Sequence, residues 1–297
     1  MPERAVSMSV GMPVAAARRS GSPADQAHGL RRLFAGAQPR HLALVANPHV
    51  AFGGVVLERL TTVLGSLGLH TLVVDAADTS PAPQELAALD LRACIEPLSP
   101  QLSYLAARGL PLRHVDARGS SAHFLERVQA AAPQCSVLLV HAGASDLARL
   151  YTQRALRPLL LAADAPDSVT HAYAAMKLLA LRCGLMSCDL LLAAPPRQPR
   201  TALIAARLAS CAESFLGVAL RDWVAIDPAC DVRDCPGADL HALVAAQLHG
   251  DDDAYDAAGI GAVTSMGAIG ASSAFPPRGA TPAGRAHASP HGALNPT

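Results

Sequence analysis

The residues from Asn47 to Val55 stand where a chain could hold a phosphate, because they follow an apolar stretch, Arg40–Ala46, and precede an amphipathic one. A loop that binds nucleotide phosphates uses backbone amides as a cradle, a lysine for the terminal phosphates and a Ser or Thr hydroxyl for magnesium. This loop reads Asn-Pro-His-Val-Ala-Phe-Gly-Gly-Val and has neither lysine nor hydroxyl. The single lysine of the chain, Lys177, is far away in sequence. The loop therefore has the position of a phosphate site without its cation.

Three residues remain as candidates for a degenerate nucleotide site. Gly53 and Gly54 could let a phosphate approach the backbone, and Asp75 ends the next apolar run. Pro48 removes one backbone N–H from any cradle, and Arg59 lies about a turn and a half into the following helix. We therefore expect no catalysis and no bound cofactor, with weak ATP binding through the glycines left open. Asp75 is explained equally well as a residue that caps the end of its strand.

Apolar segments of two kinds alternate along the chain and must position this loop. Continuous apolar runs predict strands covered on both faces, and stripes of period 3.6 predict helices. The first helix has its stripe at Val56, Leu60, Val63, Leu64 and Leu67, with Glu58, Arg59 and Thr62 off it. The predicted strands are Arg40–Ala46, His70–Asp75, Ser136–Val140, Leu156–Ala162 and Asp189–Ala193, and two further helices begin at Pro166 and Arg200. The alternation predicts an α/β protein with a doubly wound, mainly parallel sheet.

Composition excludes several classes of function. The 24 basic and 24 acidic residues give a net charge of +0, so no field draws this protein to nucleic acid. No apolar stretch approaches the ~20 residues that a membrane span needs. The 7 cysteines lack CxxC spacing, which favours reduced thiols; a zinc site with His141 or His241 is conceivable on weak spacing, and we predict no metal. We expect a cytoplasmic protein.

The chain divides by composition into four parts. Residues 1–22 and 251–297 are rich in Ala, Gly, Ser and Pro, which predicts a disordered N-terminus and a low-complexity tail. Residues 37–250 form the predicted α/β domain. Residues 23–36, between the N-terminal segment and this domain, are predicted to form a short helix with Asp25 as its N-cap.

The short N-terminal helix carries an amide on its apolar face. Gln26, Leu30 and Leu33 recur at helical spacing, so the glutamine shares a face with two leucines. Such a helix is suited to a groove on a partner protein. Packing on its own domain explains the same pattern, and the residues alone leave both interpretations open.

The order of these segments resembles the MinD/ParA family of P-loop ATPases, over roughly residues 40–250. Counting back from Asp75, the resemblance places the family's catalytic lysine at Gly53 and its threonine at Gly54. The family's additional signature lysine falls at Pro48, and the aspartate of its second motif strand falls at His141. An imidazole is a poor substitute for a hard oxygen ligand of magnesium. The resemblance thus implies the family's fold together with a lost ATPase site, that is, a pseudo-ATPase and not an enzyme.

The N-terminal helix is similar to a second, more specific element. Asp25, Gln26, Leu30 and Arg31 match the DQAxxLR element of FlhG (FleN), a MinD-type regulator of flagellar number and placement. The resemblance implies that these four residues bind and stimulate an FlhF-type signal-recognition GTPase, and it leaves a flagellar transcription activator open as a second partner. No basic amphipathic helix ends the chain, so we expect no direct membrane anchor. The alternative function is an active MinD-type ATPase switch with an unorthodox phosphate loop.

Overall fold

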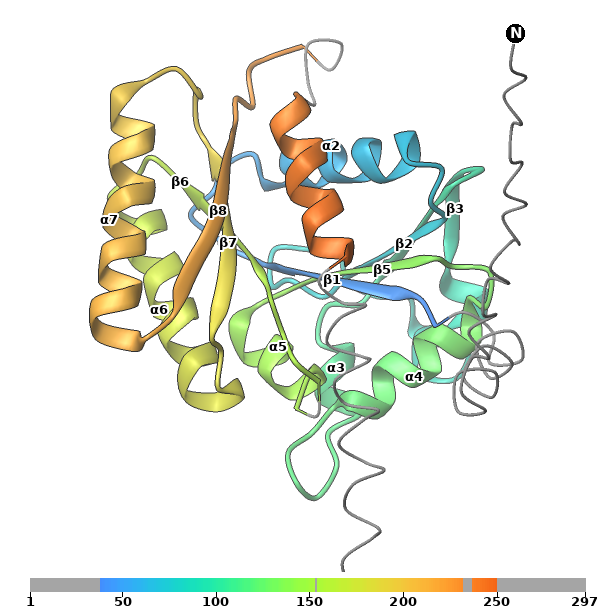
Figure 1. The fold of residues 1–297 in the computed structure, drawn as a ribbon. Helices are drawn as coiled ribbons and strands as arrows, with labels where there is room; N and C mark the ends of the chain where they lie inside the picture. Colours follow the sequence, from blue (N-terminus) through green and yellow to red (C-terminus); the bar gives the residue numbers. More distant parts are fainter. Residues whose placement is uncertain (1–37, 153, 232–236, 250–297) are drawn as a thin grey trace, which may run out of the picture. The chain divides into compact units, whose positions relative to one another are not determined.

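The computed structural model describes residues 38–152, 154–231 and 237–249. Eight strands form one sheet in the order β3-β4-β2-β5-β1-β6-β7-β8 (Figure 1). All neighbouring pairs are parallel except β3–β4, which is antiparallel. The strands are β1 (Arg40–Val45), β2 (Thr71–Asp75), β3 (Glu96–Ser99), β4 (Leu102–Ala106), β5 (Val137–Ala142), β6 (Leu159–Ala163), β7 (Ser187–Ala193) and β8 (Ala219–Ile226).

Helices cover both faces of the sheet. Alternate residues of β1 separate the faces: Ala43 and Val45 pack in one apolar cluster with α5 and α6, whereas Leu42 and Leu44 pack in another with α2. The helices are α2 (Gly53–Ser66), α3 (Leu110–Arg113), α4 (Ala122–Ala131), α5 (Ala144–Leu150), α6 (Pro166–Cys183) and α7 (Pro199–Leu216), with short 3-10 turns η1 (Glu85–Ala88) and η2 (Arg92–Cys94). Residues 238–249 are also helical. This arrangement confirms the prediction of a doubly wound, mainly parallel α/β sheet.

The last described helix shares a face of the sheet with α2. Leu240, Leu243 and Val244 join the apolar cluster that contains the buried side of α2, and the two helices lie near each other in Figure 1. Gln247 of this helix donates to the carboxylate of Asp189, which is fully buried on β7. Arg157 pairs with the same carboxylate at 2.8 Å. The helix is thus tied to the sheet by a buried polar contact as well as by apolar packing.

Both outer strands of the sheet are irregular. Pro97 interrupts β3, and the register between β3 and β4 shifts at Pro97 and Ser99. On the other side, β8 carries Arg221 and Asp222 opposite a single residue of β7, because its register shifts between Cys188 and Leu190. The extra residue is a β-bulge, which bends a strand and increases its twist.

The predicted boundaries differ modestly from the observed ones. The strand predicted at Leu156–Ala162 begins at Leu159, since Pro158 precedes it and cannot donate to a ladder. Two predictions about the first helix are wrong: Leu67 is 44% exposed after the end of α2, whereas Arg59, expected off the apolar stripe, is 2% exposed. Three predicted segments lie outside the described residues: the N-terminus predicted to be disordered (1–22), the predicted partner-binding helix (23–36) and the predicted low-complexity tail (251–297). Among the residues that are described, no helix combines the length and apolarity needed to cross a bilayer.

Candidate functional site at the carboxyl edge of the sheet

The centre of the sheet has a topological switch point at the carboxyl end of β1. The chain leaves β1 through α2 on one face, whereas it leaves the neighbouring strands β5 and β6 through α5 and α6 on the other face. The connections therefore separate above β1, and in open α/β sheets this is where ligands bind. A cavity of 350 Å³ lies here, lined by the loops that follow β1, β6, β7 and β8: residues 49–52, 163–165, 193–195 and 227–229.

The loop after β1 is held by its own first residue. Asn47 is buried, and its Nδ2 donates to the carbonyl oxygens of Leu161 (2.8 Å) and Ser168 (2.9 Å). Its Oδ1 accepts the backbone N–H of His49 at 3.1 Å, and its backbone carbonyl accepts that of Val50 at 3.1 Å. Two amides of the loop thus bond within the loop, and Pro48 has none to offer. Asn47 therefore holds the first part of the loop in place.

Gly53 and Gly54 begin α2, at the positions where the resemblance placed the lysine and threonine. Neither glycine has a positive φ, so neither is required by backbone conformation. A Cβ on Gly53 would contact Leu161 at an ordinary 3.7 Å, and one on Gly54 would meet nothing within 4 Å. Gly53 and Gly54 leave space at the N-terminus of α2, but neither the backbone conformation nor close contacts require glycine there.

The carboxylate of Asp75 accepts from three side chains at the end of β2. Nδ1 of His141 lies 2.8 Å from Oδ1, the hydroxyl of Ser80 donates to the same oxygen, and the Tyr104 hydroxyl donates to Oδ2 at 2.9 Å. Because an ionised carboxylate only accepts, Nδ1 of His141 carries the proton of its bond. Burial alone would raise the pKa of Asp75, but the bonds from His141, Ser80 and Tyr104 hold it below its ordinary value.

Tyr104 is affected in the opposite direction by the same cluster. Burial, together with the neighbouring Asp75 carboxylate, raises the pKa of its hydroxyl well above the usual range. The hydroxyl therefore stays protonated and remains a donor to Asp75 over the whole physiological range. The cluster of Asp75, His141, Ser80 and Tyr104 is an internal hydrogen-bonded group with an ionised carboxylate at its centre.

Gly53 and Gly54 lie at the start of α2, whereas Asp75 lies at the end of β2, which β5 separates from β1 in the sheet. Asp75, Gly53 and Gly54 are absent from the lining of the switch-point cavity. Asp75 ends β2, and its carboxylate accepts from the side chains of His141, Ser80 and Tyr104. Asp25, Gln26, Leu30 and Arg31 lie outside the described residues.

Sequence reasoning missed the residues that organise this edge. Asn47 could have been noticed, because an Asn-Pro pair directly after a strand is a turn signal and the asparagine amide bonds readily to nearby backbone. Ser80 and Tyr104 gave no comparable signal, since their role depends on the spatial order of strands. Lys177 is exposed on α6.

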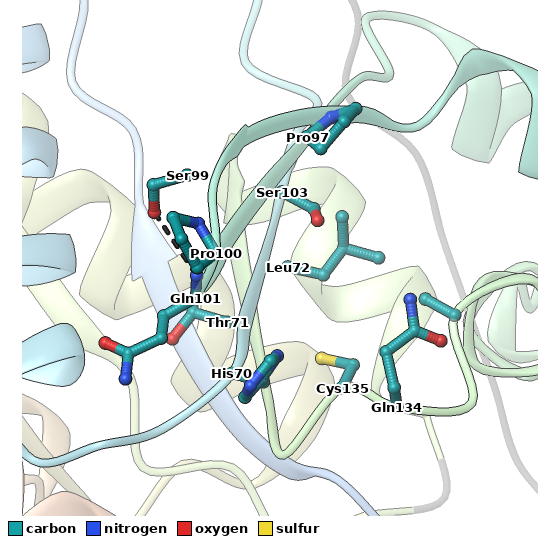
Figure 2. A pocket seen from close by; sticks show the side chains of 11 residues that line it. His70, Thr71, Leu72, Pro97, Ser99, Pro100, Gln101, Ser103, Gln134 and Cys135 are labelled. Carbon is teal, nitrogen blue, oxygen red and sulfur yellow. Dashed lines mark hydrogen bonds between the residues drawn. The ribbon is translucent and has the colours of Figure 1, made fainter.

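Other parts of the described chain offer little for a metal or a cofactor. Within those residues, no group of three or more His, Cys, Asp or Glu side chains could hold a metal ion. A second cavity, of 280 Å³, lies at the opposite, amino edge of β2 and β4. Figure 2 shows His70, Cys135 and Gln134 around it, with the Ser99–Gln101 turn closing one side. None of the predicted functional residues lines it.

Comparison with solved structures finds MinD/ParA-type proteins. A ParA-family ATPase from Chlorobium tepidum is 12% identical, with a TM-score of 0.45, covering 70% of this chain and 96% of that one. A chain of the MinC:MinD cell division protein complex of Aquifex aeolicus is 10% identical, with a TM-score of 0.48, covering 71% of this chain and 96% of that one. Apo McdA of Cyanthece is 13% identical, with a TM-score of 0.44, covering 70% and 90%. No family model and no curated protein matches the sequence at a significant level. At these identities the likeness concerns the fold alone, and the fold class follows from the strand order of this chain.

Proposed function

We propose that this chain is an FlhG-like regulator of flagellar number or placement that acts by binding proteins and does not hydrolyse ATP. Its N-terminal element, Asp25 to Arg31, stimulates an FlhF-type GTPase, and the α/β body presents that element. The similarity of four residues to the DQAxxLR element supports the choice of partner. The amide of Gln26 has the chemistry to orient a water or a phosphoryl group in the partner's nucleotide site, as glutamines do in GTPases.

The observation that carries the loss of ATP chemistry is the occupied carboxylate of Asp75. A magnesium ion needs carboxylate oxygens that are free to coordinate it in near-octahedral geometry. Here Oδ1 accepts from His141 and Ser80, and Oδ2 accepts from Tyr104. A metal would have to displace these donors, in a loop region that has no lysine to balance the phosphate charge. Without a lysine in the loop and a carboxylate free for magnesium, phosphoryl transfer would lack two of its usual sources of electrostatic stabilisation, which supports the proposal.

The test of partner stimulation is GTP hydrolysis by an FlhF-type GTPase with the full chain added. We expect wild type to accelerate hydrolysis, and Gln26→Ala to lose most of that acceleration. Lys177→Ala is the matched control, because Lys177 is exposed on α6 and should leave stimulation unchanged. Absence of stimulation by the wild type, or equal stimulation by Gln26→Ala, would reject the proposed role of the N-terminal element.

The alternative, a working ATPase switch, is favoured by one observation: the 350 Å³ cavity at the topological switch point. Gly54→Leu separates the two functions, because the structure has room for a side chain there but a bulky one would cover the N-terminus of α2. The alternative requires measurable ATP affinity and hydrolysis that Gly54→Leu removes. Our proposal expects no ATP hydrolysis by either protein, so turnover above a mock-purified control would decide for the ATPase.

A further inference from the structure

The 280 Å³ cavity at the amino edge of the sheet has no part in the proposed function (Figure 2). Its polar lining consists of His, Thr, Ser and Gln side chains, and the described residues around it include no Asp, Glu, Lys or Arg. The apolar part of the lining is Leu72, Pro97, Pro100, Ala132 and Cys135. A cavity with this lining suits an apolar side chain rather than an ion.

The first described strand begins close to this cavity. One row of register partners crosses β1, β5, β2 and β4 at the amino edge: Arg40, Val137, Thr71 and Leu102. Neighbouring strands are about 4.8 Å apart, so Arg40 lies roughly 10 Å from Thr71, which lines the cavity. The chain that precedes Arg40 therefore enters the domain within reach of the cavity.

The last turn of α4 connects the start of β1 to the cavity. Gln129 in this turn bonds to His41, the second residue of β1, at 2.7 Å. Ala132, the C-cap of α4, lines the cavity. The last turn contains no basic residue, so no cation of its own offsets the negative end of the helix. An arginine that approached this end of α4 would be stabilised there.

The sequence just before β1 has the residue types that this edge would accept. Leu30, Leu33 and Phe34 recur at helical spacing. Arg31 precedes Phe34 by three positions, so the two would share one side of a helix. Five residues, 35–39, separate Phe34 from Arg40. An extended chain of that length spans about 20 Å, which is enough to reach the cavity.

We propose that segment 23–36 docks on its own domain at the amino edge of the sheet, with Phe34 in the cavity and Arg31 at the carbonyl end of α4. The chain's own segment is favoured over a separate partner, because a short linker gives an effective concentration in the millimolar range and keeps even a weak contact formed. The docking itself needs no GTPase. One consequence rests on the proposed function: a GTPase must displace the segment before Gln26 can reach its nucleotide.

Hydrogen exchange of the full chain tests the docking, measured at the amides of residues 99–103 and 132–136 around the cavity. We expect Phe34→Asp, which replaces the apolar anchor by a charge, to speed exchange there about tenfold. His28→Asp is the control within the segment, because His28 lies off the apolar stripe. Phe215→Asp is the control on the body, because Phe215 is 76% exposed on α7. Both controls should exchange like wild type around the cavity.

The occupant is identified by two further measurements. A synthetic peptide of residues 23–36, added to Phe34→Asp, should restore slow exchange around the cavity. Protection in the wild type should be the same at all protein concentrations, because the contact is within one chain. Protection that increases with concentration would assign the cavity to a second copy and overturn the proposal.

The docking is also rejected if wild type and Phe34→Asp exchange equally around the cavity, or if Phe34→Asp speeds exchange equally in all strands. The second result would mean a general loss of stability rather than release of the segment. None of these measurements contains a GTPase, so the docking and the proposed stimulation can fail independently of each other.

Discussion

His141 Nδ1 lies 2.8 Å from Asp75 Oδ1, and the two residues occupy directly paired positions on β5 and β2. An imidazole thus donates to the carboxylate at an edge of the sheet where the resemblance led us to expect a second carboxylate. Two carboxylates so close would repel each other unless a cation separated them. In the Asp75–His141 pair the carboxylate has a hydrogen-bond donor as its neighbour. The α/β domain therefore needs no cation at this position to be stable.

Replacing Asp75 by Asn should destabilise the protein by roughly 2–4 kcal/mol, because three donors lose a charged acceptor. Urea unfolding at pH 7 measures the change. Glu58→Gln is the control, since Glu58 is exposed on α2, and it should shift the free energy of unfolding by less than about 0.5 kcal/mol. Equal effects of the two substitutions would mean that the cluster around Asp75 contributes nothing to stability.

Asn47 should be intolerant of change even without a ligand. Asn47→Ala removes donors to the carbonyls of Leu161 and Ser168, at an expected cost of about 2–4 kcal/mol. Asn47→Asp is the informative partner, because a carboxylate can still accept from His49 but cannot donate to those carbonyls. We expect Asp to be at least as damaging as Ala in urea unfolding. An Asp variant as stable as wild type would show that the donated bonds are unimportant.

His41 should make the stability depend on pH. Burial, reinforced by the nearby Arg154 charge, lowers the pKa of His41 to about 3. A depressed histidine pKa stabilises the fold above the unfolded value of 6.5, and this contribution is lost as pH falls toward the folded value. We expect His41→Gln to reduce the slope of unfolding free energy against pH between 6.5 and 4 by at most about 1.4 kcal/mol per pH unit. Identical slopes in the two proteins would contradict a buried neutral imidazole.

Asp75 should affect the pH dependence of stability at lower pH than His41 does. The hydrogen bonds hold its folded pKa below the ordinary value of 3.8, so its contribution to stability is complete above that pH and disappears as pH falls through the folded pKa. Asp75→Asn should therefore leave the slope above pH 5 unchanged and flatten it below pH 4. Measuring both slopes in one series of urea titrations separates this group from His41.

The stability of the helix of residues 238–249 should depend on the side chain of Gln247. Gln247→Leu leaves Asp189 with Arg157 and the N–H of Asp222 but removes the bond to the helix, at a cost of about 1–3 kcal/mol. Hydrogen exchange should show the loss mainly within this helix. Ala242→Gln, on the exposed side of the same helix, is the control and should leave exchange unchanged. Uniformly faster exchange over the whole chain would mean that the helix does not open separately.

The central strands were predictable because they are apolar on both faces, as in Ser136–Val140 and Asp189–Ala193. The outer strands were not, since β8 carries Arg221 and Asp222 and β3 contains Pro97, so neither forms an apolar run. Arg59 was misplaced for a related reason. A periodicity argument places arginine on the solvent side. It cannot include the bond of Arg59 to the carbonyl of Cys230 or the packing of residues 238–249 with α2.

The candidate site was only partly predictable. The missing cation follows from the composition of the loop alone, since it holds no lysine or hydroxyl. The hydrogen bond between Asp75 and His141 cannot be predicted in this way, because it depends on the position of β5 between β2 and β1 in the sheet. Tyr104 lies on β4, a strand that the apolar runs in the sequence did not predict. Sequence patterns do not predict contacts between strands that are distant in sequence.

The irregular outer strands have a consequence for how this protein can assemble. An open, straight edge offers a row of unpaired backbone groups that can recruit further chains and nucleate fibres. Pro97 on β3 and the charged bulge of Arg221 and Asp222 on β8 interrupt that row on each side. Growth of the sheet from one molecule into the next is therefore discouraged at both borders. A chain that is 51% hydrophobic can in this way reach high concentration with less risk of polymerising through its strands.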